Sequence, residues 1–115
     1  MEHSMQLRPH PFGMIKSGKK TFELRLYDEK RKKIRIGDTI CFTNTETAEK
    51  LTVRVKELFV YASFAELYRD LPLTQCGYTE ENQKEAKPED MLAYYPKEEQ
   101  QRYGVVGIQI EKINA

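Results

Sequence analysis

Apolar and polar residues alternate most clearly over residues 21–27. Phe22, Leu24 and Leu26 share one face, and the residues between them are polar or charged. A period of two is typical of a strand with one buried face. Comparable patterns predict further strands over residues 5–7, 39–43, 51–60 and 105–113.

Short helices are expected between the early and late strands. Residues 12–18 have helical spacing of apolar side chains and end in a glycine, which suits a helix C-terminus. Ser63 followed by Glu66 matches a capping box and predicts the start of another helix. Pro88 can open a third, because proline is tolerated in the first helical turn. Short strands must hide their edges, so we expect an α+β fold: a small, partly closed mixed β-barrel with short helices at one opening.

The chain has 115 residues and a mass of 13.5 kDa, which fits one domain over residues 1–115 with a loose end at residues 1–4. Hydrophobic residues make up 39% and charged residues 32%, values typical of a globular domain. The formal net charge of +1 gives no overall attraction to nucleic acid, so such binding would need a local site.

Several protein classes are not expected. No apolar run approaches the roughly 20 residues of a membrane span, and the N-terminal residues do not resemble a secretion signal. Cys41 and Cys76 do not make a disulfide framework, and with His3 and His10 they lack the spacing of a metal site. We therefore expect a cytoplasmic protein with no metal, no cofactor and no membrane partner.

The candidate chemistry lies in the segment that reads Gly18-x-Lys20-x-x-Glu23-x-Arg25. A lysine, a carboxylate and a guanidinium that converge could bind an anion, orient a planar amide or base, or activate a nucleophile. Strand alternation gives Lys20 the parity of Phe22, so it reaches the Glu23 face only if it precedes the regular strand. Glu23 and Arg25 could equally be a structural ion pair on a strand surface.

This segment resembles the signature of the ASCH domain, a branch of the PUA-like superfamily. The similarity runs from about Met5 to Ile113 and is closest to small stand-alone members in bacteria and archaea. It includes the residues Met14-Ile15-Lys16-Ser17, Gly37-Asp38, Tyr95-Pro96 and Arg102-Tyr103-Gly104-Val105. The resemblance implies a cleft between barrel and helices, lined by the signature strand, and a ligand that is RNA or a modified nucleoside.

The resemblance also suggests roles for individual residues. Lys20 and Arg25 match the signature, whereas Glu23 replaces a threonine of an amidohydrolase branch. In that branch a second acid precedes the Tyr-Pro pair, and Glu80 fits its spacing better than Glu81 does. The implied catalytic residues are Lys20, Glu23 and Glu80. The implied ligand-binding residues are Lys20, Thr21, Glu23, Arg25, Tyr95 and Tyr103, with core packing as the alternative for the two tyrosines.

Three functions follow from the resemblance. The first is an RNA or modified-nucleoside binding domain. The second is a small hydrolase, either an amidohydrolase acting on acylated cytidine-type nucleosides or a ribonuclease. The third, weighed beside what the resemblance implies, is a structural or regulatory partner in a complex. The sequence leaves the ligand, the catalytic status and the oligomeric state open, and its near-neutral charge favours a small or short ligand over long RNA.

Overall fold

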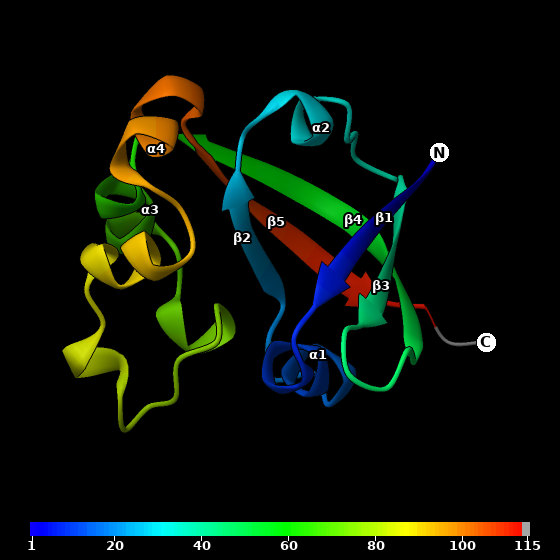
Figure 1. Cartoon of the computed structure of the whole chain (residues 1–115). Coiled ribbons are helices and arrows are strands. Elements are labelled where there is room, and N and C mark those ends of the chain that lie inside the picture. The colour runs from blue at the N-terminus through cyan, green and yellow to red at the C-terminus, as the bar shows by residue number, and fades with distance from the viewer. Residues whose placement is uncertain (114–115) are drawn as a thin grey trace.

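A single five-stranded mixed sheet, curved into a partly closed barrel, organises the chain (Figure 1). The structure, a computed structural model, describes residues 1–113. The sheet order is β1-β3-β4-β5-β2. The strands are β1 (Glu2–Leu7), β2 (Phe22–Leu26), β3 (Thr39–Asn44), β4 (Lys50–Tyr61) and β5 (Val105–Lys112). The expected α+β class and partly closed mixed barrel are confirmed.

Strand pairing explains how one sheet forms both the barrel and the wall of the site. β1 pairs with β3 in parallel, and all other pairs are antiparallel. β4 is long enough to pair with β3 along its first half and with β5 over most of its length. A register shift between Val55 and Glu57 interrupts the β4–β5 ladder, and such a bulge lets a strand bend. β2 pairs with β5 alone and therefore forms one edge of the sheet.

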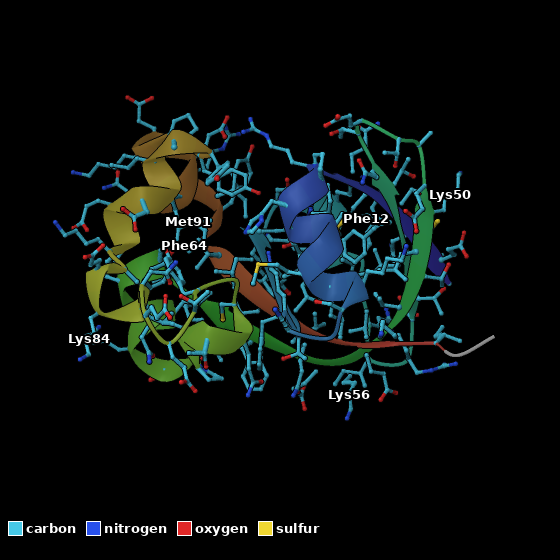
Figure 2. All side chains as sticks on the ribbon, turned by 90° about the horizontal axis from the view of Figure 1, so that it is seen from below. Phe12, Lys50, Lys56, Phe64, Lys84 and Met91 are labelled. Carbon is cyan, nitrogen blue, oxygen red and sulfur yellow. The ribbon has the colours of Figure 1, made fainter. Side chains whose placement is uncertain are left out.

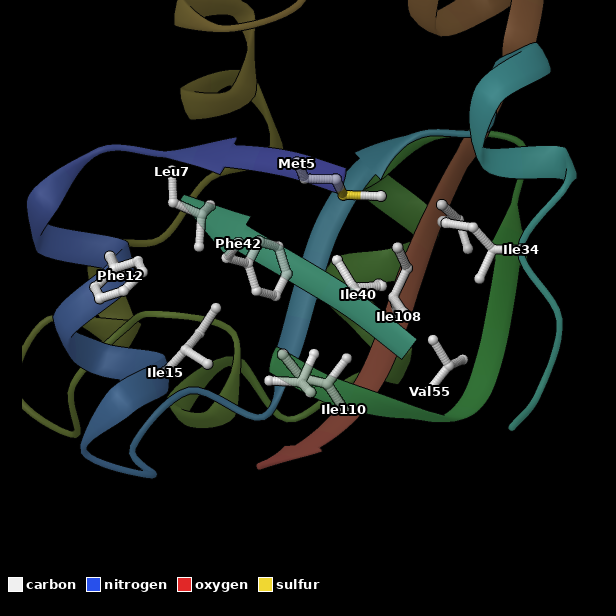
Figure 3. Close-up of a cluster of buried hydrophobic side chains, with 12 residues drawn as sticks. Met5, Leu7, Phe12, Ile15, Ile34, Ile40, Phe42, Val55, Ile108 and Ile110 are labelled. Atoms are coloured by element: carbon white, nitrogen blue, oxygen red, sulfur yellow. The ribbon is translucent and has the colours of Figure 1, made fainter. Parts of the chain in front are cut away.

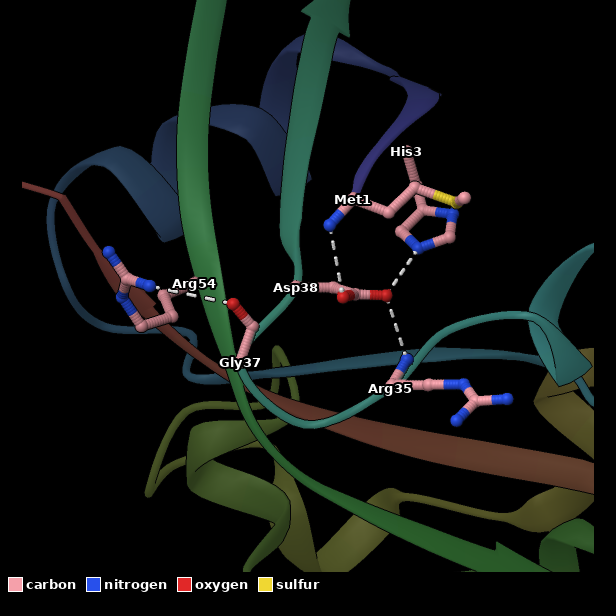
Figure 4. A network of polar contacts seen from close by, with 6 residues as sticks. All are labelled: Met1, His3, Arg35, Gly37, Asp38 and Arg54. Carbon is pink, nitrogen blue, oxygen red and sulfur yellow. Dashed lines mark hydrogen bonds and ion pairs between the residues drawn. The ribbon is translucent and has the colours of Figure 1, made fainter.

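The expectation of a loose end at residues 1–4 is wrong, because β1 begins at Glu2. His3 points inward and is 9% exposed. Its Nε2 lies 2.8 Å from Asp38 Oδ2, and the same oxygen accepts the Arg35 N–H at 3.0 Å (Figure 4). The hydrogen bond from His3, followed by that from Arg35, lowers the pKa of Asp38 to about 2. A polar residue can thus occupy an inward position of β1, which hid the strand pattern from the sequence.

The helices surround the sheet as short segments. They are α1 (Pro9–Lys16), α2 (Glu29–Lys32), α3 (Phe64–Asp70) and α4 (Lys97–Tyr103), with 3₁₀ turns η1 (Leu73–Gln75), η2 (Gln83–Glu85) and η3 (Pro88–Ala93). The expected cap of α3 is confirmed, since Ser63 Oγ accepts the Glu66 N–H at 3.3 Å. α1 starts at Pro9 rather than at Phe12, because proline fits the first helical turn. None of the helices in residues 1–113 has the length and apolar character needed to cross a bilayer.

Two clusters of buried apolar side chains hold these elements together. The first fills the barrel and is drawn in Figure 3; it includes Phe12, Ile40, Phe42 and Ile108. The second joins the apolar face of β2 to α3 and to residues 71–95. The second cluster consists of Phe22, Leu24, Leu26, Phe64, Leu67, Tyr68, Leu71, Cys76 and Val105.

The segments on the far side of β2 form a separate layer, which we call the helical lobe: α3, residues 71–95 and α4. Figure 2 shows Phe64 and Met91 of this lobe on one side and Phe12 of the barrel on the other. Gly107 of β5 permits close approach of the lobe, since a Cβ there would lie 2.5 Å from Leu71 Cδ1. A cavity lies between these two layers.

Candidate functional site

A cavity of about 540 Å³ opens between the barrel and the helical lobe. One wall comes from the end of β1, the start of α1 and the strand β2. The other wall comes from α3 and from residues 76–95. The apolar lining includes Leu7, Pro11, Met14 and Met91, and polar side chains from both walls enter the same space.

Three charged side chains of the signature segment meet on the β2 wall. Lys20 Nζ donates to Glu23 Oε1 at 2.9 Å. Arg25 donates to Glu23 Oε2 through Nε at 3.1 Å and through Nη2 at 2.9 Å. Lys20 precedes the first strand residue, Phe22, so the alternation of the strand does not force it to the apolar face. The structure therefore shows the convergence of Lys20, Glu23 and Arg25 on which the predicted site depends.

These charges are nearly sealed from solvent. The exposed fraction of the side chain is 4% for Glu23, 10% for Lys20 and 15% for Arg25. Burial acts to raise the pKa of Glu23, but the charges of Lys20 and Arg25 outweigh it, and the pKa is lowered. Burial likewise acts to lower the pKa of Arg25, and Glu23 reverses this, so the pKa is raised. Glu23 and Arg25 therefore stay ionised, and with Lys20 the cluster holds two cationic side chains against one carboxylate.

Counting hydrogen-bond donors shows what the cluster can offer a ligand. Both Glu23 oxygens accept from a cation, so Glu23 acts first as the anchor of its neighbours. Arg25 Nη2 also donates to the Gln6 carbonyl at 2.9 Å, which ties β2 to the end of β1. Within residues 1–113, Lys20 keeps two N–H donors, and Nη1 of Arg25 supplies two more, with the Tyr95 hydroxyl beside the guanidinium. The β2 wall can therefore bind carbonyl oxygens, ring nitrogens or an anion.

Tyr95 is the other predicted site residue that lines the cavity. Its ring stacks on Phe64, with centroids 6.1 Å apart and planes 17° from parallel. Burial raises the pKa of the Tyr95 hydroxyl, and Arg25 partly opposes this. The phenol is thus neutral and borders the guanidinium of Arg25. Both expectations for Tyr95, packing and cavity lining, are met by one side chain.

The remaining predicted site residues, all within the described part of the chain, do not line this cavity. The Thr21 hydroxyl donates to Gln75 Oε1 at 2.9 Å and faces a neighbouring cavity of about 310 Å³. Tyr103 packs on the second apolar cluster, with the Arg102 guanidinium 5.2 Å from its ring. Glu80 and Glu81 are exposed in the turn that follows Thr79. The structure therefore brings together Lys20, Glu23, Arg25 and Tyr95.

The cavity also contains three residues that the sequence pattern did not reveal as site residues. The hydroxyls of Tyr68 and Tyr78 lie 2.8 Å apart, and Tyr78 donates to Asp90 Oδ2 at 3.3 Å. The same Asp90 oxygen accepts the Lys87 N–H at 3.0 Å and so caps η3. An acid two residues after Pro88 was the available signal for Asp90, but it indicates a cap and not a cavity.

Cys76 lines the cavity as a buried thiol. Burial raises the pKa of its thiol to about 12, with Lys20 opposing the shift in part. A protonated thiol is a weak nucleophile and a weak metal ligand. Across residues 1–113, no three His, Cys, Asp or Glu side chains gather in the manner of a metal site. The polar and charged side chains of the lining offer a ligand hydrogen-bond donors, acceptors and charge.

Comparisons with known proteins agree over nearly the whole chain. The ASCH domain profile matches residues 5–114. The crystal structure of the hypothetical protein PH0355 is similar at 38% identity with a TM-score of 0.79, covering 98% of this chain and all of that one. The protein PF0455 from Pyrococcus furiosus is similar at 36% identity with a TM-score of 0.71, covering all of both chains. ASCH from Zymomonas mobilis shares the fold at 14% identity and a TM-score of 0.65, over 96% of this chain and 67% of that one. No curated protein matches.

Proposed function

This chain belongs to the ASCH domain family, and on that basis we propose that its cavity binds a nucleobase carried by a short RNA or a modified nucleoside. The observation that supports this most is the buried cluster of Lys20, Glu23 and Arg25, which opens into a cavity also lined by tyrosines. Its volume of about 540 Å³ falls within the range of small-molecule sites, about 300–1,000 Å³.

The walls suit the two faces of a nucleobase. The remaining N–H groups of Lys20 and Arg25 can donate to the carbonyl oxygens and ring nitrogens at the edge of a base. Tyr95 and the apolar side chains beside it can cover its flat surface. Proteins recognise single-stranded bases by this combination of stacking and edge hydrogen bonds. A base and its sugar would thus be bound at one defined site.

The charge of the molecule favours a small or short ligand. The formal net charge is +1, while sequence-independent binding to long nucleic acid depends on many Lys and Arg contacts to phosphates. The positive charge at the β2 wall is local, since the Glu23 carboxylate offsets one of the two cationic side chains there. Affinity should come from the base and should depend weakly on salt.

Hydrolysis is the second candidate, because a cation and an acid, Lys20 and Asp90, line one cavity. An amidohydrolase acting on acylated cytidine-type nucleosides, or a ribonuclease, needs an acid–base group and a cation for the developing negative charge. Glu23 is a poor candidate for the base because both of its oxygens are held by cations. Binding without turnover therefore ranks first, and the cytoplasm is the compartment we propose for it.

Calorimetric titration with cytidine, N4-acetylcytidine and single-stranded RNA hexamers tests the proposal. Lys20→Met removes the charge and keeps the aliphatic stem, and Arg25 still pairs with Glu23 in that variant. Lys50→Met is the matched control, since Lys50 is exposed at the start of β4, away from the helical lobe (Figure 2). We expect saturable binding that Lys20→Met weakens by about tenfold, because a charged hydrogen bond is lost, and that Lys50→Met leaves unchanged.

The same samples separate the alternatives. Chromatography of the titrated mixtures detects cytidine released from N4-acetylcytidine or shortened RNA, and Lys20-dependent release would put hydrolysis first. The proposal of a nucleobase site is overturned if no probe binds saturably, or if the two lysine variants weaken binding equally.

A further inference from the structure

The hydroxyls of the helical-lobe wall have a fixed direction of hydrogen bonding. Tyr78 has one hydroxyl proton, and it is donated to Asp90 Oδ2 at 3.3 Å. The Tyr68 hydroxyl, 2.8 Å away, must then donate to the Tyr78 oxygen. Both phenolic protons are used within the wall. The groups that remain toward the cavity are lone pairs, so this wall presents hydrogen-bond acceptors.

The β2 wall has the reverse polarity. Lys20 and Arg25 present N–H groups only. Among their acceptor neighbours, Glu23 is engaged at both oxygens, the Gln6 carbonyl accepts from Arg25, and the Tyr95 hydroxyl lies beside the Arg25 guanidinium. A ligand that touches both walls must therefore accept hydrogen bonds on one side and donate on the other. Few planar groups do so over a short span; an amidine-like base edge with an amino group beside a ring nitrogen is one of them.

We propose that Tyr68, Tyr78 and Asp90 select nucleobases that carry an exocyclic amino group, with the Tyr78 oxygen accepting one of its N–H groups. This inference rests on the proposed function of the cavity and names its specificity. Tyr78 is half-buried and would contact the ligand, whereas Tyr68 is 9% exposed and serves to orient Tyr78.

Asp90 is a positioning residue in this scheme. Its Oδ2 also accepts the Lys87 N–H at 3.0 Å, which holds the carboxylate at the start of η3. By accepting the Tyr78 proton, Asp90 keeps the Tyr78 oxygen available as an acceptor. Without that acceptor the Tyr78 proton would be free to point into the cavity, and the polarity of the wall would reverse.

Matched pairs of nucleosides measure this polarity directly. Cytidine and uridine exchange an amino group for a carbonyl oxygen, and the adjoining ring nitrogen changes from an acceptor to an N–H donor; adenosine and inosine differ by the same exchange in a purine. We expect wild-type protein to prefer the amino member of the pair it binds by about a hundredfold, about tenfold for each of two mismatched hydrogen bonds, one to Tyr78 and one to the β2 wall.

Four variants assign the preference to the wall. Asp90→Ala frees the Tyr78 proton, and Tyr78→Phe removes the acceptor, so each should lower the preference by about tenfold, the share of the Tyr78 hydrogen bond. Asp90→Asn keeps an oxygen that can accept from both Tyr78 and Lys87, so it should retain the preference. Tyr68→Phe should also retain it, because Tyr78 still donates to Asp90. Asp90 is exposed and its loss removes one cap of a 3₁₀ turn, so all four variants should fold, which circular dichroism checks.

The outcomes distinguish this inference from the proposed function. Failure of the wild-type protein to bind any of the four nucleosides or RNA would overturn the nucleobase site itself. Binding of both members of each pair with equal affinity, or a preference that Asp90→Ala leaves unchanged, would overturn the role of Tyr68, Tyr78 and Asp90 in specificity and leave the nucleobase site standing.

Discussion

At the residue scale, the central feature is a carboxylate, Glu23, that is 4% exposed at its side chain and held by two cations. Breaking a buried ion pair leaves uncompensated charge in a poorly solvated position, which is costly even where forming the pair gained little. Lys20 and Arg25 would be left facing each other if Glu23 lost its charge. The cluster is thus both the candidate site and a condition for the stability of β2.

We expect Glu23→Gln to lower the free energy of unfolding by about 3 kcal/mol, because it leaves two nearly buried cations without their counter-charge. Urea denaturation followed by circular dichroism measures this. Glu49→Gln is the control, because the Glu49–Lys16 pair has 44% and 57% of its side chains exposed and should contribute less than about 1 kcal/mol. Equal losses of unfolding free energy in the two variants would show that the ion pairs of Glu23 contribute no more to stability than the ion pair of an exposed acid.

The pH dependence of stability should also reflect the lowered pKa of Glu23. The pKa of Glu23 is lowered from its ordinary value of 4.5, so the folded state releases this proton more readily than the unfolded chain. The resulting stability is fully present above pH 4.5 and is lost as the pH falls through the lowered pKa. Asp38, with a pKa of about 2 instead of 3.8, adds a similar loss at acidic pH.

Denaturation at a series of pH values from 7 down to the acid transition checks this reasoning, since the unfolding free energy is expected to fall below pH 4.5. Glu23→Gln should show a shallower fall than wild type, and Asp38→Asn should remove the part that belongs to the β1–β3 contact. A wild-type curve that stays flat from neutral pH to the acid transition would contradict both lowered pKa values.

The sequence pattern predicts some residues of the cavity and misses others, and the difference has a physical reason. Lys20, Glu23 and Arg25 lie within one short segment, so strand geometry alone limits where they can point. Tyr78 and Asp90 come from a stretch with no periodic pattern, and their contact depends on how 3₁₀ turns pack against α3. Local spacing can place the first group, whereas the second group needs the folded chain.

At the element scale, the junction between α4 and β5 depends on Gly104. Its φ of +72° is favoured by glycine alone, and a Cβ would lie 2.9 Å from the Tyr61 carbonyl oxygen. The Gly104 carbonyl in turn accepts the Tyr27 N–H at 3.0 Å, which holds the end of β2. This glycine therefore connects three strands: β2, β4 and β5.

We expect Gly104→Ala to destabilise the protein by about 2 kcal/mol or more, through a disfavoured φ and a clash with backbone. Gly13→Ala is the matched control: it lies in α1 with nothing within 4 Å of its added Cβ, and should stabilise by about 0.5–1 kcal/mol. Thermal or urea unfolding of the two variants measures both changes. A destabilisation of similar size in the two would contradict the special role of position 104.

Element boundaries show how far periodicity can be trusted in this chain. The β2 alternation and the Ser63 cap were recovered because every residue involved follows the rule for its element. The sequence pattern predicts β1 only over residues 5–7, because His3 occupies an inward position that depends on Asp38, a residue far along the chain. A tertiary hydrogen bond of that kind leaves no trace in local periodicity.

At the scale of the whole molecule, the cavity lies between two layers of different construction. The barrel strands share long ladders, and Ile40, Phe42, Val53 and Ile108 are fully buried. In residues 73–95 of the helical lobe, Cys76 is the one buried side chain among the described residues. Most backbone hydrogen bonds there span three or four residues, as from Asp90 to Lys87 and from Tyr94 to Met91. One wall of the site is therefore rigid, and the other is held by local turns.

Native-state hydrogen exchange should resolve this difference, because segments with few buried contacts open without global unfolding. Amides of residues 79–95 are expected to exchange on the order of a hundredfold faster than those of Val106 and Ile108 in β5. A nucleoside that bridges Lys20 and Tyr78 would have to order this wall, so saturating ligand should slow exchange over residues 78–95 and leave the centre of β5 unchanged. Equal protection of the helical lobe and the sheet without ligand would contradict this expectation. It would mean that the two layers open together and that the wall containing Tyr68 and Tyr78 is already ordered in the absence of a ligand.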